Sequence, residues 1–183
     1  MKLAFNTIAR RSVVGGLCAA AAALLAATPA LAARPTLKYQ SEIAVKAAPA
    51  KAWDSFKTFS AIHAWHPVTE GTRLLVGEDG KALAVREFQL KGGGFVISEL
   101  LSYNEAGKRF KYRIIKTNLP LANYVGEMWV TPGKGGGAVV HWTATFQRPD
   151  EQAKPDQDDA ATEKLVQGVF KAGLDNLAAI NAK

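Results

Sequence analysis

Hydrophobic and polar residues alternate along residues 37–46. Leu37, Tyr39, Ile43 and Val45 fall on one side, and most of the positions between them are charged or polar. A period of two is typical of a β-strand with one buried face. We therefore expect a strand here.

The spacing of the large apolar residues lengthens between residues 47 and 69. Trp53, Phe56 and Trp65 suit one or two short helices, and Pro67 closes the segment. The pattern thus predicts two short helices directly after the first strand.

Residues 73–148 alternate between short apolar runs and turn-forming residues, which is typical of consecutive β-hairpins. The predicted turns fall at residues 78–80, 92–94, 104–107, 118–120 and 132–137. They separate six strands along the chain. With the first strand included, we expect an antiparallel sheet of about seven strands.

A long amphipathic helix is predicted at the C-terminal end, after the polar segment 148–159. Apolar residues and one glycine recur there every four positions, at Leu165, Val169, Gly173 and Leu177. This spacing gives one apolar face on a helix of about 20 residues, which is about 30 Å long. One strand, two short helices, six strands and one long helix together predict an α+β fold.

The first 32 residues have the features of a signal peptide. A basic start is followed by the apolar run 13–25, and Ala30-Leu31-Ala32 fits a cleavage site before Ala33. The apolar run is short for a membrane span, which needs about 20 residues. We therefore expect residues 33–183 to form a single domain that is periplasmic or secreted, with the choice between Sec and Tat export left open.

Charge and cysteine content narrow the function classes. The net charge is +7, and Lys2, Arg10 and Arg11 leave with the signal peptide, so about +4 remains in the mature chain. Basic residues are scattered, which does not favour a nucleic-acid surface. Cys18, the only cysteine, lies in the segment that is removed. The mature chain thus has no disulfide and no cysteine ligand for zinc, and we expect no cofactor.

Three segments resemble a known superfamily. They are PAKAWDSFKTFSAIHAWHP at 49–67, ELLSYNE at 99–105 and LANYVGEMWVTP at 121–132. The sequence is similar to the START/birch-allergen (SRPBCC) superfamily, within its polyketide cyclase/dehydrase-like group. The signal peptide also makes it similar to an exported subgroup that includes accessory proteins of methanol oxidation.

The resemblance implies a helix-grip fold, in which a curved sheet wraps the C-terminal helix and leaves a cavity between them. Members of the superfamily bind sterols, lipids, hormones or polyketide intermediates there, and some catalyse cyclisation or dehydration. The resemblance also implies that Glu99 and Tyr124 face the ligand, and that residues 92–94 correspond to a gate.

Strand parity and the helix pattern predict the residues that line this cavity. The apolar candidates are Trp65, Phe88, Phe95, Ile97, Leu101, Tyr112, Tyr124, Met128, Trp142, Leu165, Val169 and Gly173. For Gly173 two interpretations stay open, since a missing side chain either leaves room for a ligand or allows the helix to pack closely on the sheet.

The cavity is also predicted to hold one ion pair. If Gly92 and Gly93 form a two-residue turn, Arg86 lies opposite Glu99, and opposed residues point to the same face. The third glycine would allow the register to slip by one residue. The pair would either fix strand register or serve as a polar handle for a ligand, because arginine binds carboxylates in a fork.

The histidines are the remaining candidates for chemistry. His63 and His66 are three residues apart, but no further ligands at a suitable spacing support a zinc site, so no metal is expected. Solvent-exposed or capping roles are the alternative for both. His66 and Glu99 would form a catalytic acid–base pair only if the fold brought them together.

Three functions follow from these patterns. The first is a periplasmic carrier of a small hydrophobic ligand, which would meet the membrane only during transient ligand exchange. The second is an accessory protein that docks on a periplasmic redox enzyme, and an exposed patch of Trp129, Leu100 and Val125 together with a small cavity would favour it. The third is a cyclase, dehydratase or isomerase that uses His66 and Glu99.

Overall fold

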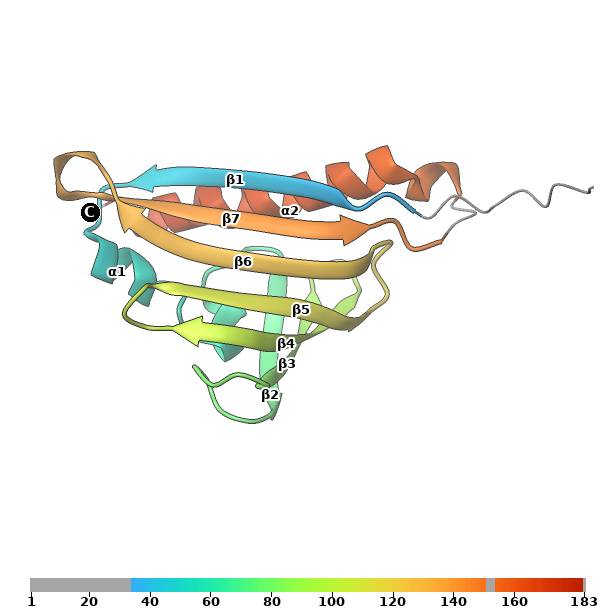
Figure 1. Cartoon of the computed structure of the whole chain (residues 1–183), viewed down its shortest axis with the longest axis horizontal. Coiled ribbons are helices and arrows are strands. Elements are labelled where there is room, and N and C mark those ends of the chain that lie inside the picture. The colour runs from blue at the N-terminus through green and yellow to red at the C-terminus, as the bar shows by residue number, and fades with distance from the viewer. Residues whose placement is uncertain (1–33, 151–153, 183) are drawn as a thin grey trace, which may run out of the picture. The chain divides into compact units, whose positions relative to one another are not determined.

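A computed structural model describes residues 34–150 and 154–182, which form one antiparallel sheet and its covering helices (Figure 1). The strands are β1 (Leu37–Val45), β2 (Thr69–Val76), β3 (Val85–Leu90), β4 (Phe95–Asn104), β5 (Arg109–Thr117), β6 (Ala122–Pro132) and β7 (Ala138–Gln147). The helices are α1 (Pro49–Asp54), α2 (Asp159–Ile180) and three 3-10 turns, η1 (Phe59–Ala64), η2 (Lys134–Gly136) and η3 (Pro155–Gln157). The predicted signal peptide and its cleavage site lie outside the described residues.

The seven strands lie in the order β1-β7-β6-β5-β4-β3-β2, and all neighbours are antiparallel. This arrangement confirms the predicted α+β helix-grip fold, with α1 and η1 as the two short helices after the first strand. The topology follows the chain order, because each strand from β2 to β6 pairs with the next strand along the chain and β1 pairs with β7.

Helix α2 packs along β1 and β7 (Figure 1). Its buried residues are Thr162, Val166, Phe170, Gly173, Leu174 and Leu177. The Phe170 ring stacks on Trp142 of β7, with ring centroids 4.1 Å apart. Of the predicted line, Gly173 and Leu177 are buried, whereas Leu165 and Val169 are half-buried and line a cavity.

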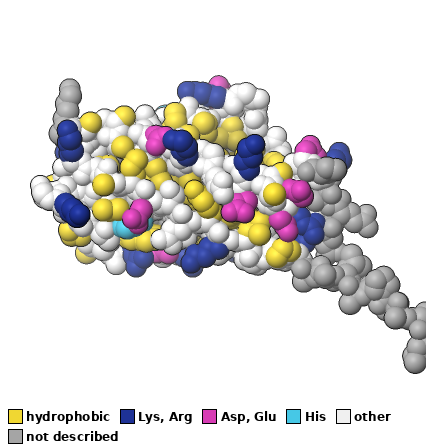
Figure 2. Space-filling view, turned by 90° about the horizontal axis from the view of Figure 1, so that it is seen from above, with side chains coloured by type: hydrophobic (Ala, Val, Ile, Leu, Met, Phe, Trp, Pro, Cys, Tyr) yellow, Lys and Arg dark blue, Asp and Glu magenta, His cyan; other side chains and the backbone are white. Residues whose placement is uncertain are grey.

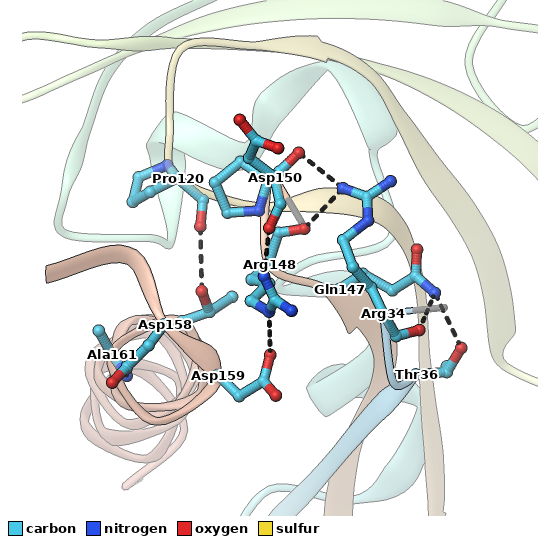
Figure 3. A network of polar contacts seen from close by, with 11 residues as sticks. Arg34, Thr36, Pro120, Gln147, Arg148, Asp150, Asp158, Asp159 and Ala161 are labelled. Atoms are coloured by element: carbon cyan, nitrogen blue, oxygen red, sulfur yellow. Dashed lines mark hydrogen bonds and ion pairs between the residues drawn. The ribbon is translucent and has the colours of Figure 1, made fainter. Parts of the chain in front are cut away.

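Polar contacts fix the beginning of α2 against the sheet (Figure 3). Asp158 caps the helix by accepting a hydrogen bond of 2.8 Å from a backbone N–H one turn further on. The Arg148 guanidinium forms an ion pair of 3.0 Å with Asp159. The hydroxyl of Thr162 donates to the carbonyl of Pro120. These contacts hold the helix start next to the β5–β6 loop.

The hairpin between β3 and β4 differs from the predicted one. The N–H of Leu90 donates to the Gly94 carbonyl at 3.0 Å, so the loop holds three residues instead of two. Gly92, Gly93 and Gly94 all have positive φ, which glycine adopts at little cost. As a result Arg86 lies opposite Ser98, and the register differs by one residue from the prediction.

This shift of one residue reverses the faces of β4 from Phe95 to Leu100, because side chains alternate between the two faces of a strand, and a register shift between Leu100 and Ser102 ends the reversed stretch. Val96, Ser98 and Leu100 are buried on the concave side. The predicted inward set was therefore wrong, and its members Phe95, Ile97, Glu99 and Leu101 lie on the outer side of the sheet.

Charged side chains are spread over the surface. On the face that Figure 2 shows, Lys and Arg side chains alternate with Asp and Glu side chains among hydrophobic ones. On the outer side of the sheet, the Glu99 carboxylate lies 3.0 Å from the Arg113 guanidinium on the next strand. Exposed pairs of this kind contribute little to stability.

Candidate functional site

A cavity of about 430 Å³ lies between the inner face of the sheet and α2. Its wall is mostly apolar and is built by η1, by β2 to β7 and by the first half of α2. Four of its lining residues, Lys91, Gly93, Lys164 and Gly168, are exposed. The cavity therefore opens to solvent between the β3–β4 loop and the beginning of α2.

Eight of the predicted site residues line this cavity. They are His66, Arg86, Phe88, Tyr112, Tyr124, Trp142, Leu165 and Val169. Seven of them come from the inner faces of β3 and β5 to β7 and from α2, and His66 comes from the segment between η1 and β2.

The other predicted residues lie elsewhere. Trp65 and Met128 are buried in the core beside the cavity, and Trp65 packs against Trp142 with ring centroids 5.8 Å apart. The residues predicted on the inner face of β4 lie on the outer face instead, at Phe95, Ile97, Glu99 and Leu101. The predicted Arg86–Glu99 ion pair does not form.

Gly173 provides close packing and does not line the cavity. A methyl group at this position would lie 2.9 Å from His66 Cδ2 and 2.9 Å from Trp142 Cζ3. Both rings are buried, so neither can move aside freely. Of the two interpretations left open by the sequence, the structure supports the close approach of α2 to the sheet.

Alanine substitutions at two glycines of α2 test whether Gly173 is needed for close packing. Gly173→Ala should lower stability by about 1 kcal/mol, because overpacking of about 1–3 kcal/mol exceeds the gain in helix propensity of about 1 kcal/mol. Gly168→Ala, where a methyl group meets nothing within 4 Å, should raise stability by a similar amount. Urea titrations of both variants check this, and equal shifts in the same direction would contradict it.

Several lining residues were missed by the sequence analysis. They include Val68, Leu90, Val96, Leu119 and Leu121. Val96 was assigned to the wrong face of β4. Val68, Leu119 and Leu121 lie in loops, where neither a period of two nor a period of 3.6 carries a signal.

Arg86 is a buried cation on the cavity wall, only 3% exposed. Its Nε donates to the Ser98 hydroxyl at 3.0 Å, and its Nη1 donates to the carbonyl of Phe59. The guanidinium carbon lies 3.9 Å from the centre of the Phe59 ring. Burial lowers the pKa of Arg86 to about 10, so it stays protonated at neutral pH. Within residues 34–150 and 154–182 it has no ion pair with a carboxylate.

Two tyrosines form a hydrogen-bonded pair on the same wall. The hydroxyls of Tyr112 and Tyr124 are 3.0 Å apart, and Trp142 Nε1 donates to the Tyr112 hydroxyl at 3.0 Å. Burial raises the pKa of both tyrosines, so both keep their protons. One hydrogen is used between the two hydroxyls. The second hydrogen of the pair has no acceptor among the described residues and is available to a ligand.

His66 is the third polar group of the cavity and is 2% exposed. Its Nε2 lies 3.1 Å from the carbonyl of Val169, which can only accept, so Nε2 carries the proton. Burial lowers the pKa of His66 to about 4, which keeps the ring neutral. Its buried Nδ1 has no partner in the described part of the chain and is left as an unused acceptor of a residue that lines the cavity. The predicted exposed or capping role was wrong for His66.

The alternative sites from the sequence do not assemble. His66 and Glu99 lie on opposite faces of the sheet, so they form no acid–base pair. His63 is exposed and contacts Thr72, and the described residues contain no group of three metal-ligating side chains. On the outer face, Trp129 stacks on His141, whereas Leu100 is fully buried, so the predicted patch of Trp129, Leu100 and Val125 does not form.

Comparisons with known proteins agree with this geometry. The fold is similar to that of the protein XoxI from Bacillus cereus (TM-score 0.68, 21% identity, covering 79% of this chain and 94% of that one). It is also similar to a protein from Thermobifida fusca (TM-score 0.63, 28% identity, covering 78% and 90%). A third similar structure is ginseng major latex-like protein 151 from Panax ginseng (TM-score 0.62, 18% identity, covering 81% and 99%).

None of the curated proteins matches the chain in sequence. Residues 36–180 match the family described as "Polyketide cyclase / dehydrase and lipid transport". This match covers nearly all of the described residues and includes every residue that lines the cavity. The chain therefore belongs to the polyketide cyclase/dehydrase and lipid transport family.

Proposed function

We propose that the mature chain is a periplasmic or secreted protein that binds and carries a small hydrophobic ligand in the cavity between the sheet and α2. The observation that carries this proposal is the cavity itself, which has apolar walls, an opening to solvent and three buried polar groups. Binding sites for small molecules have this composition, and their volumes are about 300–1,000 Å³. Membership of a family that includes lipid-transport proteins supports the same function.

The proposed location rests on the sequence of residues 1–32, with its basic start, apolar run and Ala-Leu-Ala site. Among the helices that the structure describes, none is both long and apolar enough to cross a membrane. We propose that the protein contacts a membrane only while it exchanges its ligand. Fractionation of the source cells, followed by N-terminal sequencing of the mature protein, tests the cleavage before Ala33.

Native mass spectrometry of protein purified from its own periplasm tests the carrier function. We expect a retained small-molecule adduct that organic solvent removes. Val169→Trp should abolish the adduct, because the larger side chain enters the cavity from α2. The control Val125→Trp makes the same change on the outer face of β6, and it should keep the adduct.

Loss of the adduct in both variants would contradict the cavity as the binding site. A co-purifying protein in place of a small molecule would favour the accessory function instead. The thermal unfolding of each variant should be recorded alongside, so that a change in binding can be separated from a loss of folding.

A further inference from the structure

The charged residues of the cavity are all cations. Arg86 lies inside, whereas Lys91 and Lys164 lie exposed at the opening. No Asp or Glu is among the lining residues, as far as the described ranges 34–150 and 154–182 show. A cavity that holds only a neutral hydrophobic molecule does not need this excess of positive charge.

Arg86 has N–H donors that no described residue uses. A guanidinium carries five N–H groups, and only two of those of Arg86 have a partner among the described residues, the Ser98 hydroxyl and the Phe59 carbonyl. Both partners are neutral, and although the charge of Asp79 raises the pKa of Arg86 against the larger lowering by burial, no carboxylate of the described residues forms an ion pair with Arg86. Burying an unpaired charge is costly, and a sequence under selection for stability alone would place an apolar residue here. The missing counterion is therefore expected from the ligand.

We propose that the ligand is an organic monoacid, whose apolar part fills the cavity and whose carboxylate binds the free N–H groups of Arg86. This inference deepens the proposed carrier function and rests on it. The guanidinium carbon lies 5.7 Å from the centre of the Tyr112 ring, so Arg86 and the tyrosine pair belong to the same polar end of the cavity.

A single negative charge suits the site better than two. One guanidinium neutralises one carboxylate in a planar fork with two parallel hydrogen bonds. A phosphate monoester would bring close to two negative charges into the same buried place, and the second would remain uncompensated. The neutral His66 ring adds an acceptor, Nδ1, which would bind a hydroxyl group of the ligand.

The two lysines have a separate effect. Lys91 and Lys164 lie at the opening, where exposed positive charge raises the association rate of an anion without contributing much to its affinity. Binding of the acid should therefore become slower as salt is added, whereas binding of a neutral analogue should not.

Binding of a matched pair of probes tests the proposal. Decanoate and decan-1-ol have the same chain length and differ in the charged head group. At neutral pH, isothermal titration should show that the wild-type protein binds decanoate about tenfold or more tightly than decan-1-ol, as hydrogen bonds to a charged group imply. In Arg86→Gln this preference should fall to parity, while binding of decan-1-ol persists and thereby shows that the cavity is intact.

Two controls sharpen the comparison. Lys91→Gln combined with Lys164→Gln should slow the association of decanoate but keep its preference over decan-1-ol. The pair 2-naphthoate and 2-naphthylmethanol repeats the test with a ring in place of a chain, and it shows whether chain acids or aromatic acids fit the cavity better.

Each outcome decides one point. If the wild-type protein binds decanoate and decan-1-ol equally, the proposed acid class is wrong although the carrier function stands. If the preference survives in Arg86→Gln, the assignment to Arg86 is wrong. If neither probe pair binds to the wild-type protein at all, the proposed carrier function fails with it.

Discussion

Gly126→Ala should lower the stability of the protein by about 3 kcal/mol and its melting temperature by about 6–12 °C. Gly126 of β6 lies directly opposite Tyr112 of β5, and the tyrosine ring lies over the glycine. A methyl group at Gly126 would lie 2.6 Å from Tyr112 Cζ. The buried ring must shift, and the shift also breaks its hydrogen bonds to Tyr124 and Trp142.

Differential scanning calorimetry checks this result against a matched glycine. Gly71→Ala places the same methyl group on a strand where nothing lies within 4 Å, so it should leave the melting temperature unchanged or slightly higher. A double-mutant cycle gives the stricter test, because Gly126→Ala should cost little once Tyr112→Ala has removed the ring. Additive effects of Gly126→Ala and Tyr112→Ala would show that the steric explanation is wrong.

The role of Gly126 in stability could not have been predicted from the sequence of β6 alone. Its neighbours Tyr124 and Met128 correctly predict which face of β6 is buried. The close contact, however, is with a ring from another strand, and it depends on the β5–β6 register. Sequence patterns report the period of a strand, but they do not report which side chain of the next strand lies opposite.

The general architecture was predictable because three different signals agree. Turn residues divide 73–148 into six strands, a period of two marks β1, and a spacing of four residues marks α2. Each signal is repeated along its element, so an error at one position does not change the result. This redundancy explains why the number and the order of the elements were right.

The predicted orientation of β4 rested on a single feature, the length of the preceding turn, and was wrong. Both sides of this strand are largely apolar, with Phe95 and Ile97 on one side and Val96 and Leu100 on the other. Hydrophobicity therefore does not decide which side faces inward. The length of the preceding turn decides it, and three successive glycines permit a loop of either two or three residues.

That error changes the chemistry assigned to the site. With Glu99 inside, Arg86 would have had a counterion, and the pair would have been a structural salt bridge or a polar handle for a ligand. With Ser98 inside, the guanidinium is left with neutral partners. A difference of one residue in a glycine turn thus replaces the predicted Arg86–Glu99 ion pair with a buried arginine that has only neutral hydrogen-bond partners. The proposed ligand class depends on this difference.

His66 should make the stability of the protein depend strongly on pH between about 6.5 and 4. Burial lowers its pKa from the usual 6.5 to about 4 in the folded state. In this interval the unfolded chain binds a proton that the folded protein does not bind, so stability is full above pH 6.5 and falls as the pH decreases. A difference of about 2.5 pKa units corresponds to about 3 kcal/mol.

Urea unfolding of the wild-type protein and of His66→Gln at a series of pH values tests this. Glutamine can still donate to the Val169 carbonyl but does not titrate, so the variant should lose about 3 kcal/mol less than the wild-type protein between pH 7 and pH 4. His63→Gln makes the same substitution in the same segment and leaves His66 in place, so it should follow the wild-type curve. Parallel curves for wild type and His66→Gln would show that the His66 ring accepts its proton as easily in the folded protein as in the unfolded chain. The neutral Nδ1 acceptor assigned to the cavity would then have to be withdrawn.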